Sequence, residues 1–365
     1  MTSSPGSAAD TRLVRSLLDE VNLKTEALCR TRRQINLMEV CGTHTMAISR
    51  FGIRRAVDQR LRLLSGPGCP VCVTTQQEID GAISLAQAKD VVLVTFGDMM
   101  RVPGSRGSLE QAKARGRDVR MVYSALDALS LAAEDGKRQF VFLGVGFETT
   151  APTVAAAVLT ARDRGIENFS VLPMFKLIPP ALKMIAGAAR VSIDGLILPG
   201  HVSTVIGTEP YRFLPEKHRL PCCVTGFESS DVIQGILVLL DQIEQGPEVA
   251  NQYRRCVQPQ GNPEARRVMD TVFEPVSARW RGLGRIPGSG LAFRKSFARF
   301  DARERFTLKP GPVRKTACRC GDVMLGIIVP PECGLFGKGC TPETPIGPCM
   351  VSSEGACAAY YKYDR

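Results

Sequence analysis

Residues 138–165, RQFVFLGVGFETTAPTVAAAVLTARDRG, pass from an apolar, strand-like stretch through an elbow of Gly, Glu and Thr into a helix-like stretch. The same order recurs along the chain, at residues 35–45, 61–70, 90–98 and 194–207. Short apolar runs that alternate with helix-like stretches are typical of β/α units around parallel sheets. The sequence therefore predicts the α/β class.

Two further patterns divide the chain. The triplet at 146–148, Gly-Phe-Glu, recurs at 226–228 after a second strand-like run, which favours two Rossmann-like α/β lobes. Pro, Gln and Asn interrupt the pattern at 245–266, and residues 267–317 are then expected to be helical and afterwards basic and loop-rich. The expected domains are an N-terminal helical segment at 1–35, α/β domains at 36–130 and 131–255, and a C-terminal helical and loop domain at 256–365.

Composition limits the function classes. Apolar residues make up 44% and charged residues 23% of the 365 residues, so disordered, collagen-like and low-complexity classes are excluded. The formal net charge of +11 indicates a generally basic surface, and a nucleic-acid-binding function would rest on that charge alone. The sequence has no apolar run of roughly 18 residues and no hydrophobic leader, so the chain is expected in the cytoplasm.

Thirteen cysteines are many for a chain expected in a reducing compartment, and they point to metal or redox chemistry. Most of the late ones fit the spacing C-x14-C-x6-C-x16-C. These are Cys318, Cys333, Cys340 and Cys357. Four thiolates in the Gly- and Pro-rich tail at 318–365 favour a [4Fe–4S] cluster, with zinc or unliganded structural thiols as the alternatives. Cys320 and Cys349 remain as a second redox pair.

The segment GPGCPVC at 66–72 places Cys69 and Cys72 in a C-x-x-C motif before a helix-like stretch. A helix N-terminus stabilises a thiolate and lowers its pKa, so this pair is expected to act as a dithiol/disulfide switch. Structural thiols are the alternative interpretation.

The segment CGTHT at 41–45 places Cys41 and His44 three residues apart at a strand end. A thiolate and an imidazole there can bind iron, copper or zinc, or act as nucleophile and base. A buried structural cysteine is the alternative. His201 also follows a strand-like run, and open α/β sheets bind their ligands at such strand ends.

The elbows at 146–150 and 199–204 offer hydroxyl groups that can cap a helix or bind an anion. Neither elbow matches a phosphate-binding or dinucleotide-binding glycine motif. Four other cysteines are expected to be structural: Cys29, Cys222, Cys223 and Cys256.

Several motifs together resemble the HypD family of hydrogenase maturation factors. They are CGTHT at 41–45, GPGCPVC at 66–72, GFETTAP at 146–152, PGHVSTVIG at 199–207, PCCVTGFE at 221–228 and CMVSSEGACAAYYKY at 349–363. The resemblance covers nearly the whole chain after about residue 35. It implies two α/β domains, a third domain that binds the cluster, and a scaffold on which the Fe(CN)2CO unit of nickel-iron hydrogenase is assembled. The implied partners are the small chaperone HypC, HypE with HypF as the cyanide source and, indirectly, the hydrogenase large subunit.

The resemblance also implies roles for single residues. Cys41 would bind the iron together with a HypC cysteine, and His44 would tune or protonate what binds there. Cys69 and Cys72 would be the thiol pair at that site, and Cys320 and Cys349 would relay electrons between the cluster and this pair. Supporting positions are Thr43, Thr45, Glu148, Thr149, Thr150 and His201. The motifs leave open whether such a scaffold is an enzyme, and the competing class is a stand-alone, iron-sulfur-dependent thiol-disulfide oxidoreductase.

Overall fold

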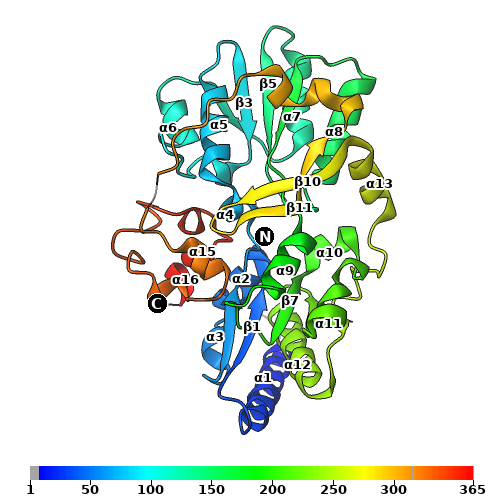
Figure 1. The fold of residues 1–365 in the computed structure, drawn as a ribbon, viewed down its shortest axis with the longest axis vertical. Coiled ribbons are helices and arrows are strands. Elements are labelled where there is room, and N and C mark those ends of the chain that lie inside the picture. Colours follow the sequence, from blue (N-terminus) through cyan, green and yellow to red (C-terminus); the bar gives the residue numbers. More distant parts are fainter. Residues whose placement is uncertain (1–7, 315, 365) are drawn as a thin grey trace.

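Two parallel β-sheets organise the chain into two lobes in the computed structural model, which describes residues 8–314 and 316–364 (Figure 1). The first sheet has the strand order β2-β1-β7-β8-β9 and the second has the order β4-β3-β5-β6. Every strand pair within these two sheets is parallel, which confirms the predicted α/β class.

The strands of the first sheet are β1 (Ile35–Glu39), β2 (Leu61–Ser65), β7 (Gly195–Pro199), β8 (Cys222–Thr225) and β9 (Val249–Asn251). The strands of the second sheet are β3 (Val91–Thr95), β4 (Val119–Met121), β5 (Gln139–Gly144) and β6 (Phe169–Pro173). The chain therefore builds two of the five strands of the first sheet, then the whole second sheet, and then returns to complete the first. The predicted stretches 36–130 and 131–255 each contribute strands to both sheets, so residue 130 does not separate the two sheets.

Helices cover both sheets. The α-helices are α1 (Ala8–Leu28), α2 (Gly42–Arg50), α3 (Ile53–Ala56), α4 (Pro70–Val73), α5 (Gln76–Ala86), α6 (Leu109–Ala114), α7 (Ala125–Glu134), α8 (Ala151–Asp163), α9 (Ile178–Ala186), α10 (Gly200–Ile206), α11 (Phe213–His218), α12 (Ser229–Gln245), α13 (Pro263–Val272), α14 (Ala302–Arg305), α15 (Cys320–Met324) and α16 (Ala356–Tyr363). The 3-10 helices are η1 (Gly97–Met99), η2 (Glu209–Tyr211), η3 (Lys295–Phe300), η4 (Pro330–Glu332) and η5 (Pro348–Met350).

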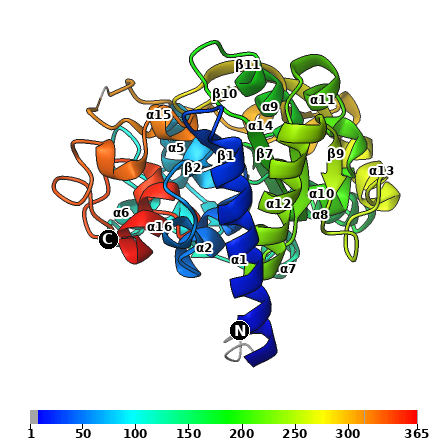
Figure 2. The same cartoon turned by 90° about the horizontal axis from the view of Figure 1, so that it is seen from below.

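Alternation along the strands decides which helices pack on which face of the first sheet. Leu37 and Leu63 point to a core shared with α1 and α12, whereas their neighbours Met38 and Leu64 point to the opposite core. That opposite core also holds residues of the Cys-rich tail. Figure 2 shows α1 and α12 side by side below the sheet and the tail on one flank. The sheet face thus supplies the apolar surface that the tail itself lacks.

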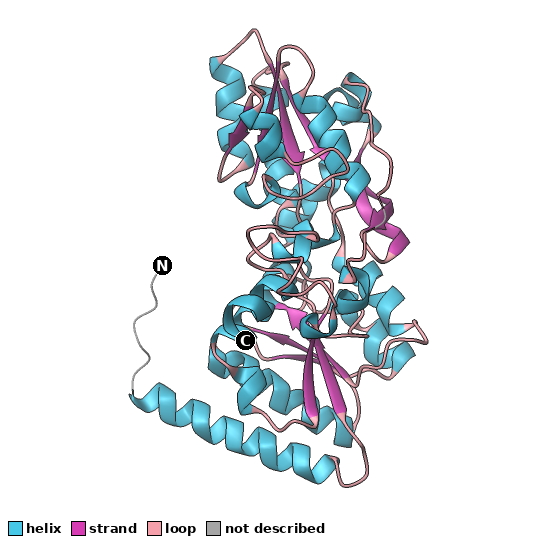
Figure 3. Ribbon diagram, turned by 90° about the vertical axis from the view of Figure 1, so that its left-hand side faces the viewer, coloured by secondary structure: helices cyan, strands magenta, loops and turns pink. Residues whose placement is uncertain are grey.

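A β-hairpin replaces part of the segment expected to be helical and loop-rich. After α13, the chain forms two antiparallel strands, β10 (Phe273–Trp280) and β11 (Gly284–Phe293). The prediction for 267–317 was wrong here because β10 carries charged side chains on its exposed positions and β11 contains glycines and a proline, which hide the strand pattern. Figure 3 shows this hairpin between the two main sheets.

No helix within residues 8–314 and 316–364 is both long enough and apolar enough to cross a membrane.

Candidate functional site

The predicted motifs meet at one edge of the first sheet. GPGCPVC follows β2, CGTHT follows β1, PGHVST follows β7 and the Gly-Phe-Glu triplet at 226–228 follows β8, and these four strands are neighbours in the sheet. Strand β1 connects outward to β2 on one side, and β7 connects outward to β8 on the other. Such a reversal of strand order opens a crevice at the carboxyl ends of the strands, where α/β proteins bind ligands. Cys41 lies at this point.

Cys41 precedes the first residue of α2, and its side chain is buried. The backbone N–H groups of Thr43 and His44 donate toward its sulfur. Burial nevertheless raises the pKa of the thiol, with a smaller contribution from the neighbouring carboxyl groups of Glu354 and Glu39, to about 12 in all. The thiol is therefore neutral in the free chain, and a cation bound to the sulfur would favour its deprotonation.

Two acidic residues that the sequence analysis did not single out surround Cys41. Glu39 accepts hydrogen bonds from the backbone N–H of Cys41, at 2.9 Å, and from the hydroxyl of Thr45. The carboxylate of Glu354, in the tail, accepts a 2.9 Å hydrogen bond from Thr43 Oγ1. Glu39 could have been found as a carboxyl group inside an apolar strand, whereas only the fold brings Glu354 to α2.

The loop at 66–72 is pressed against Cys41. The backbone N–H of Gly42 donates to the carbonyl of Gly68 at 2.8 Å. A methyl group on Gly68 would come within 2.1 Å of the backbone nitrogen of Cys41. Only glycine fits at this position, and the close approach fixes the C-x-x-C loop relative to Cys41.

Gly68→Ala is therefore expected to lower the free energy of unfolding by about 3 kcal/mol, because the new methyl group meets backbone atoms that cannot rotate away. Gly136→Ala is the matched control, since nothing lies within 4 Å of its added carbon. Urea denaturation of both variants measures the difference. Equal stability of Gly68→Ala and the parent chain would contradict the packing described here.

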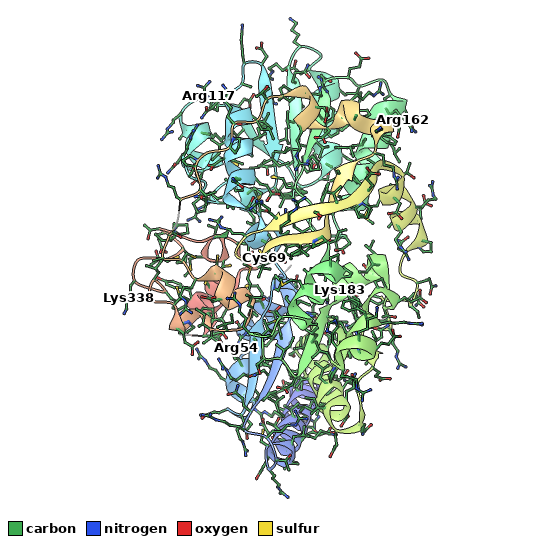
Figure 4. The ribbon with its side chains drawn as sticks, in the orientation of Figure 1. Arg54, Cys69, Arg117, Arg162, Lys183 and Lys338 are labelled. Atoms are coloured by element: carbon green, nitrogen blue, oxygen red, sulfur yellow. The ribbon has the colours of Figure 1, made fainter. Side chains whose placement is uncertain are left out.

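Cys69 and Cys72 form a close, buried pair. Their sulfur atoms lie 2.6 Å apart, and the backbone N–H of Cys72 donates to the sulfur of Cys69 at 3.2 Å. Burial raises the pKa of the Cys72 thiol well above its usual value, and hydrogen bonds with Cys349 and Cys69 raise it further. The expected lowering of the thiol pKa at a helix N-terminus is thus wrong for Cys72, because burial outweighs the effect of the four-residue helix α4. Figure 4 shows Cys69 at the junction of the lobes.

The cysteines of the tail gather around one small cavity. Its volume is about 20 Å³, and its walls include Val323, Leu335, Phe336 and Met350. The cysteines that line it are Cys318, Cys320, Cys333, Cys340, Cys349 and Cys357. Residues widely separated in sequence thus share one sulfur-rich centre. No three His, Cys, Asp or Glu side chains in the described parts of the chain are placed to hold a single metal ion between them.

Cys349 links this cavity to the buried pair. It lines the cavity, and its thiol hydrogen-bonds with Cys72. Cys320 instead hydrogen-bonds with Cys318, which raises the pKa of the Cys318 thiol. The two extra cysteines therefore lie in different places, with Cys349 toward the C-x-x-C pair and Cys320 beside Cys318.

His44 contacts Cys41 through its backbone, while its imidazole points to the β8–α12 connection. The ring Nε2 lies 2.9 Å from the carbonyl oxygen of Gly226 and 2.9 Å from the hydroxyl of Thr225. Burial lowers the pKa of His44 to about 4, so the ring is neutral near pH 7. The carbonyl of Gly226 requires the proton on Nε2, which leaves Nδ1 as an acceptor. His201 and His44 both stack on Phe227, with ring centroids 3.9 and 4.8 Å away.

A larger cavity opens between the carboxyl edges of the two sheets. Its volume is about 570 Å³. Residues from both lobes and from the tail line it, including Pro70, Val71, Asp98, Thr150 and Glu354. Because Glu354 also hydrogen-bonds with Thr43, this cavity adjoins the first turn of α2 beside Cys41.

Only part of the elbow at 146–150 lines this cavity. Thr150 lines it, whereas Thr149 is half-buried at the start of the same turn and does not line it. Glu148 is buried, and its Oε1 accepts a 2.9 Å hydrogen bond from the backbone N–H of Ile178. Its Oε2 has no hydrogen-bond partner among the described residues.

Glu148 is expected to make stability fall with rising pH. Burial raises the pKa of its carboxyl group from 4.5 to about 7 in the folded chain. The unfolded chain therefore loses this proton first, and the free energy of unfolding decreases from about pH 4.5 to about pH 7. The decrease is on the order of 3 kcal/mol for this group. Glu148→Gln should remove this part of the decrease in urea denaturation series from about pH 5 to about pH 8.

The exposed Glu134→Gln is the control, and its pH profile should match that of the parent chain. An unchanged profile of Glu148→Gln would show that the carboxyl group ionises equally in both states.

Comparisons with known proteins agree with these motifs. A family model described as "HypD: Hydrogenase formation hypA family" matches residues 12–364. The chain is 47% identical over 360 residues to a hydrogenase maturation factor HypD of Rhizobium leguminosarum bv. viciae, covering 96% of this chain and 94% of that protein. It is 46% identical over 359 residues to a HypD of Cupriavidus necator, covering 96% and 95%. A putative hydrogenase expression/formation protein of Methanocaldococcus jannaschii is 40% identical over 359 residues, covering 98% of each chain.

Proposed function

The chain belongs to the HypD family and is a hydrogenase maturation factor, and from this we propose that it is the scaffold on which the Fe(CN)2CO unit of nickel-iron hydrogenase is assembled. In this proposal iron is held between Cys41 and a cysteine of a HypC-like small chaperone. HypE, with HypF, supplies the cyanide groups. The assembly takes place in the cytoplasm, where thiols stay reduced.

The environment of Cys41 is the observation that supports this proposal most strongly. Its neutral thiol lies beside Glu39 and Glu354, whose carboxyl groups both have a pKa raised by burial. Placing iron on the sulfur would supply positive charge to a site rich in acidic groups, and the thiol proton would leave as the bond forms. Cys41 offers one soft ligand, and the adjoining cavity leaves room for ligands that the partner brings.

The donors around the small tail cavity fit a [4Fe–4S] cluster. We propose that Cys318, Cys333, Cys340 and Cys357 hold it, because all four line the same apolar cavity and thiolate sulfur is the ligand that such clusters use. A bound cluster would supply one-electron redox chemistry. The walls formed by Leu335 and Phe336 would limit its contact with water.

The paired thiols are proposed to cycle between dithiol and disulfide. Oxidation of Cys69 and Cys72 would join their sulfurs and release two protons and two electrons, and reduction reverses this. The hydrogen bond between Cys72 and Cys349 supports Cys349 as the member of the predicted relay that faces the pair. Cys320, which adjoins Cys318, would serve the opposite side of the cavity.

A stand-alone thiol-disulfide oxidoreductase is less consistent with this geometry. Such an enzyme must bring a protein disulfide to an accessible thiolate. Cys69 and Cys72 are only 4% and 2% exposed, and burial raises the pKa of Cys72. That class would also give no role to the acidic surroundings of Cys41.

Anaerobic co-purification with a HypC-like chaperone tests the proposal. A stable complex that contains about four cluster irons with matching sulfide, plus one further iron, is the expected result. A complex without iron beyond the cluster, even when HypE and HypF are co-expressed, would contradict the assembly role.

A further inference from the structure

A basic groove adjoins both the tail cavity and the residues that follow the C-x-x-C helix α4. Its volume is about 480 Å³, and it is formed where the turn of the β10–β11 hairpin meets the start of α15. Cys318 and Cys320 line both this groove and the sulfur-rich cavity. The groove is therefore a place where the surface comes close to the tail cysteines.

The groove is strongly one-sided in charge. Four arginines line it: Arg279, Arg281, Arg314 and Arg319. Among the lining residues that the structure describes, Asp322 is the only one with a carboxylate, and it pairs with Arg319 at 2.9 Å. Arg281 lines the groove together with Cys318 and Cys320. Its Nη1 is buried and has no hydrogen-bond partner within the described residues.

The groove is held in shape by close backbone contact. Gly282, in the hairpin turn, has a φ of +77°, and a carbon added to it would lie 2.6 Å from the Cα of Gly321 in α15. The backbone N–H of Arg281 donates to the carbonyl of Val73, the last residue of the C-x-x-C helix α4, at 2.8 Å. The arginines are thus carried by elements that also fix the cysteines.

We infer that this groove docks a small acidic electron-carrier protein. Positive charge with little internal compensation favours an acidic partner surface, and it raises the rate of productive encounter. Proximity of the groove to Cys318 and Cys320 gives the partner's redox centre a short path into the tail. The inference rests on the proposed redox cycle of the thiol pair: two reduced one-electron carriers and two protons convert one Cys69–Cys72 disulfide into two thiols, and each carrier leaves oxidised by one electron.

The test is binding of an acidic [2Fe–2S] ferredoxin to the full chain, purified anaerobically and measured by isothermal titration calorimetry. The variant is Arg279→Glu combined with Arg314→Glu, two exposed arginines that line the groove. We expect at least about tenfold weaker binding at low salt, and a smaller difference at high salt. The control is Arg115→Glu with Arg117→Glu. It makes the same charge change at two exposed arginines between α6 and β4, in the lobe of the second sheet (Figure 4).

Equal weakening by both double variants would overturn the groove as the docking site, because only net charge would matter. Tight, arginine-dependent binding of a nucleic-acid duplex in place of the ferredoxin would overturn the choice of partner. The titration uses neither the HypC-like chaperone nor cyanide, so a failure of the iron-assembly proposal leaves its outcome unaffected. Iron and sulfide analysis of each variant shows separately whether the tail centre is intact.

Discussion

Cys41→Ala is expected to abolish hydrogenase maturation while leaving the iron content of the tail unchanged. The sulfur of Cys41 is the only iron ligand that we assign to this chain in the assembly site, so its removal leaves the iron to the partner alone. Changes to groups that merely support a metal ligand cost roughly 10- to 100-fold, and loss of the ligand itself should cost more. Hydrogenase activity in a strain that lacks its own family member measures the effect.

The control for this prediction is Cys29→Ala, which removes a half-buried cysteine just after α1, at the amino-terminal end of the first sheet. It should restore hydrogenase activity as well as the parent chain does. If Cys41→Ala also restored activity, the role assigned to the crevice would be wrong. If it lost the tail iron as well, the variant would be misfolded, and Cys41→Ser, which is closer in size, would replace it in the same assay.

The double change Cys69→Ala and Cys72→Ala is expected to abolish maturation and to preserve the absorption spectrum of the proposed tail cluster. The two sulfurs contact each other and Cys349, but the proposed cluster ligands are other residues. The pair is buried, so the smaller alanines cost some stability, on the order of 1 kcal/mol per site. That cost leaves the fold intact and separates a redox role from a structural one.

The two single variants test whether both sulfurs are required. Cys69→Ala and Cys72→Ala alone should each be as inactive as the double variant, because a disulfide requires both sulfurs. Alkylation of denatured samples should trap the pair as thiols under reducing conditions and as a disulfide after oxidation. Full maturation by the double variant would refute the redox cycle and leave the pair with a packing role.

The β/α pattern was sufficient to predict the two parallel sheets, because several strands, such as β1, β2, β5 and β7, end in a Gly- or Thr-rich elbow that a helix follows. It did not reveal that β7 pairs with β1, since strand neighbours are chosen by three-dimensional packing and not by order in the chain. The β10–β11 hairpin was missed for a local reason. Its charged and glycine-rich strands gain their stability by packing against the second-sheet core.

The sequence predicted the motifs that form the site, but not how the fold brings them into contact. Cysteine spacing predicted a common centre for the tail, and the six cysteines do line one cavity. The sequence could not place Glu354 beside Thr43, because that contact joins residues 311 positions apart. The environment of the thiols was also hidden. A helix N-terminus is visible in the sequence, whereas the burial that raises the pKa of Cys72 depends on the tail packing over it.

Infrared spectroscopy of the anaerobically purified complex with a HypC-like chaperone tests the central claim most directly. Metal-bound cyanide and carbon monoxide give separate stretching bands, so the spectrum reports the ligands of the assembled iron itself. The account predicts both kinds of band in the parent complex and neither in the complex with Cys41→Ala. Bands of equal strength in the two complexes would contradict it, because the iron would then be held without Cys41.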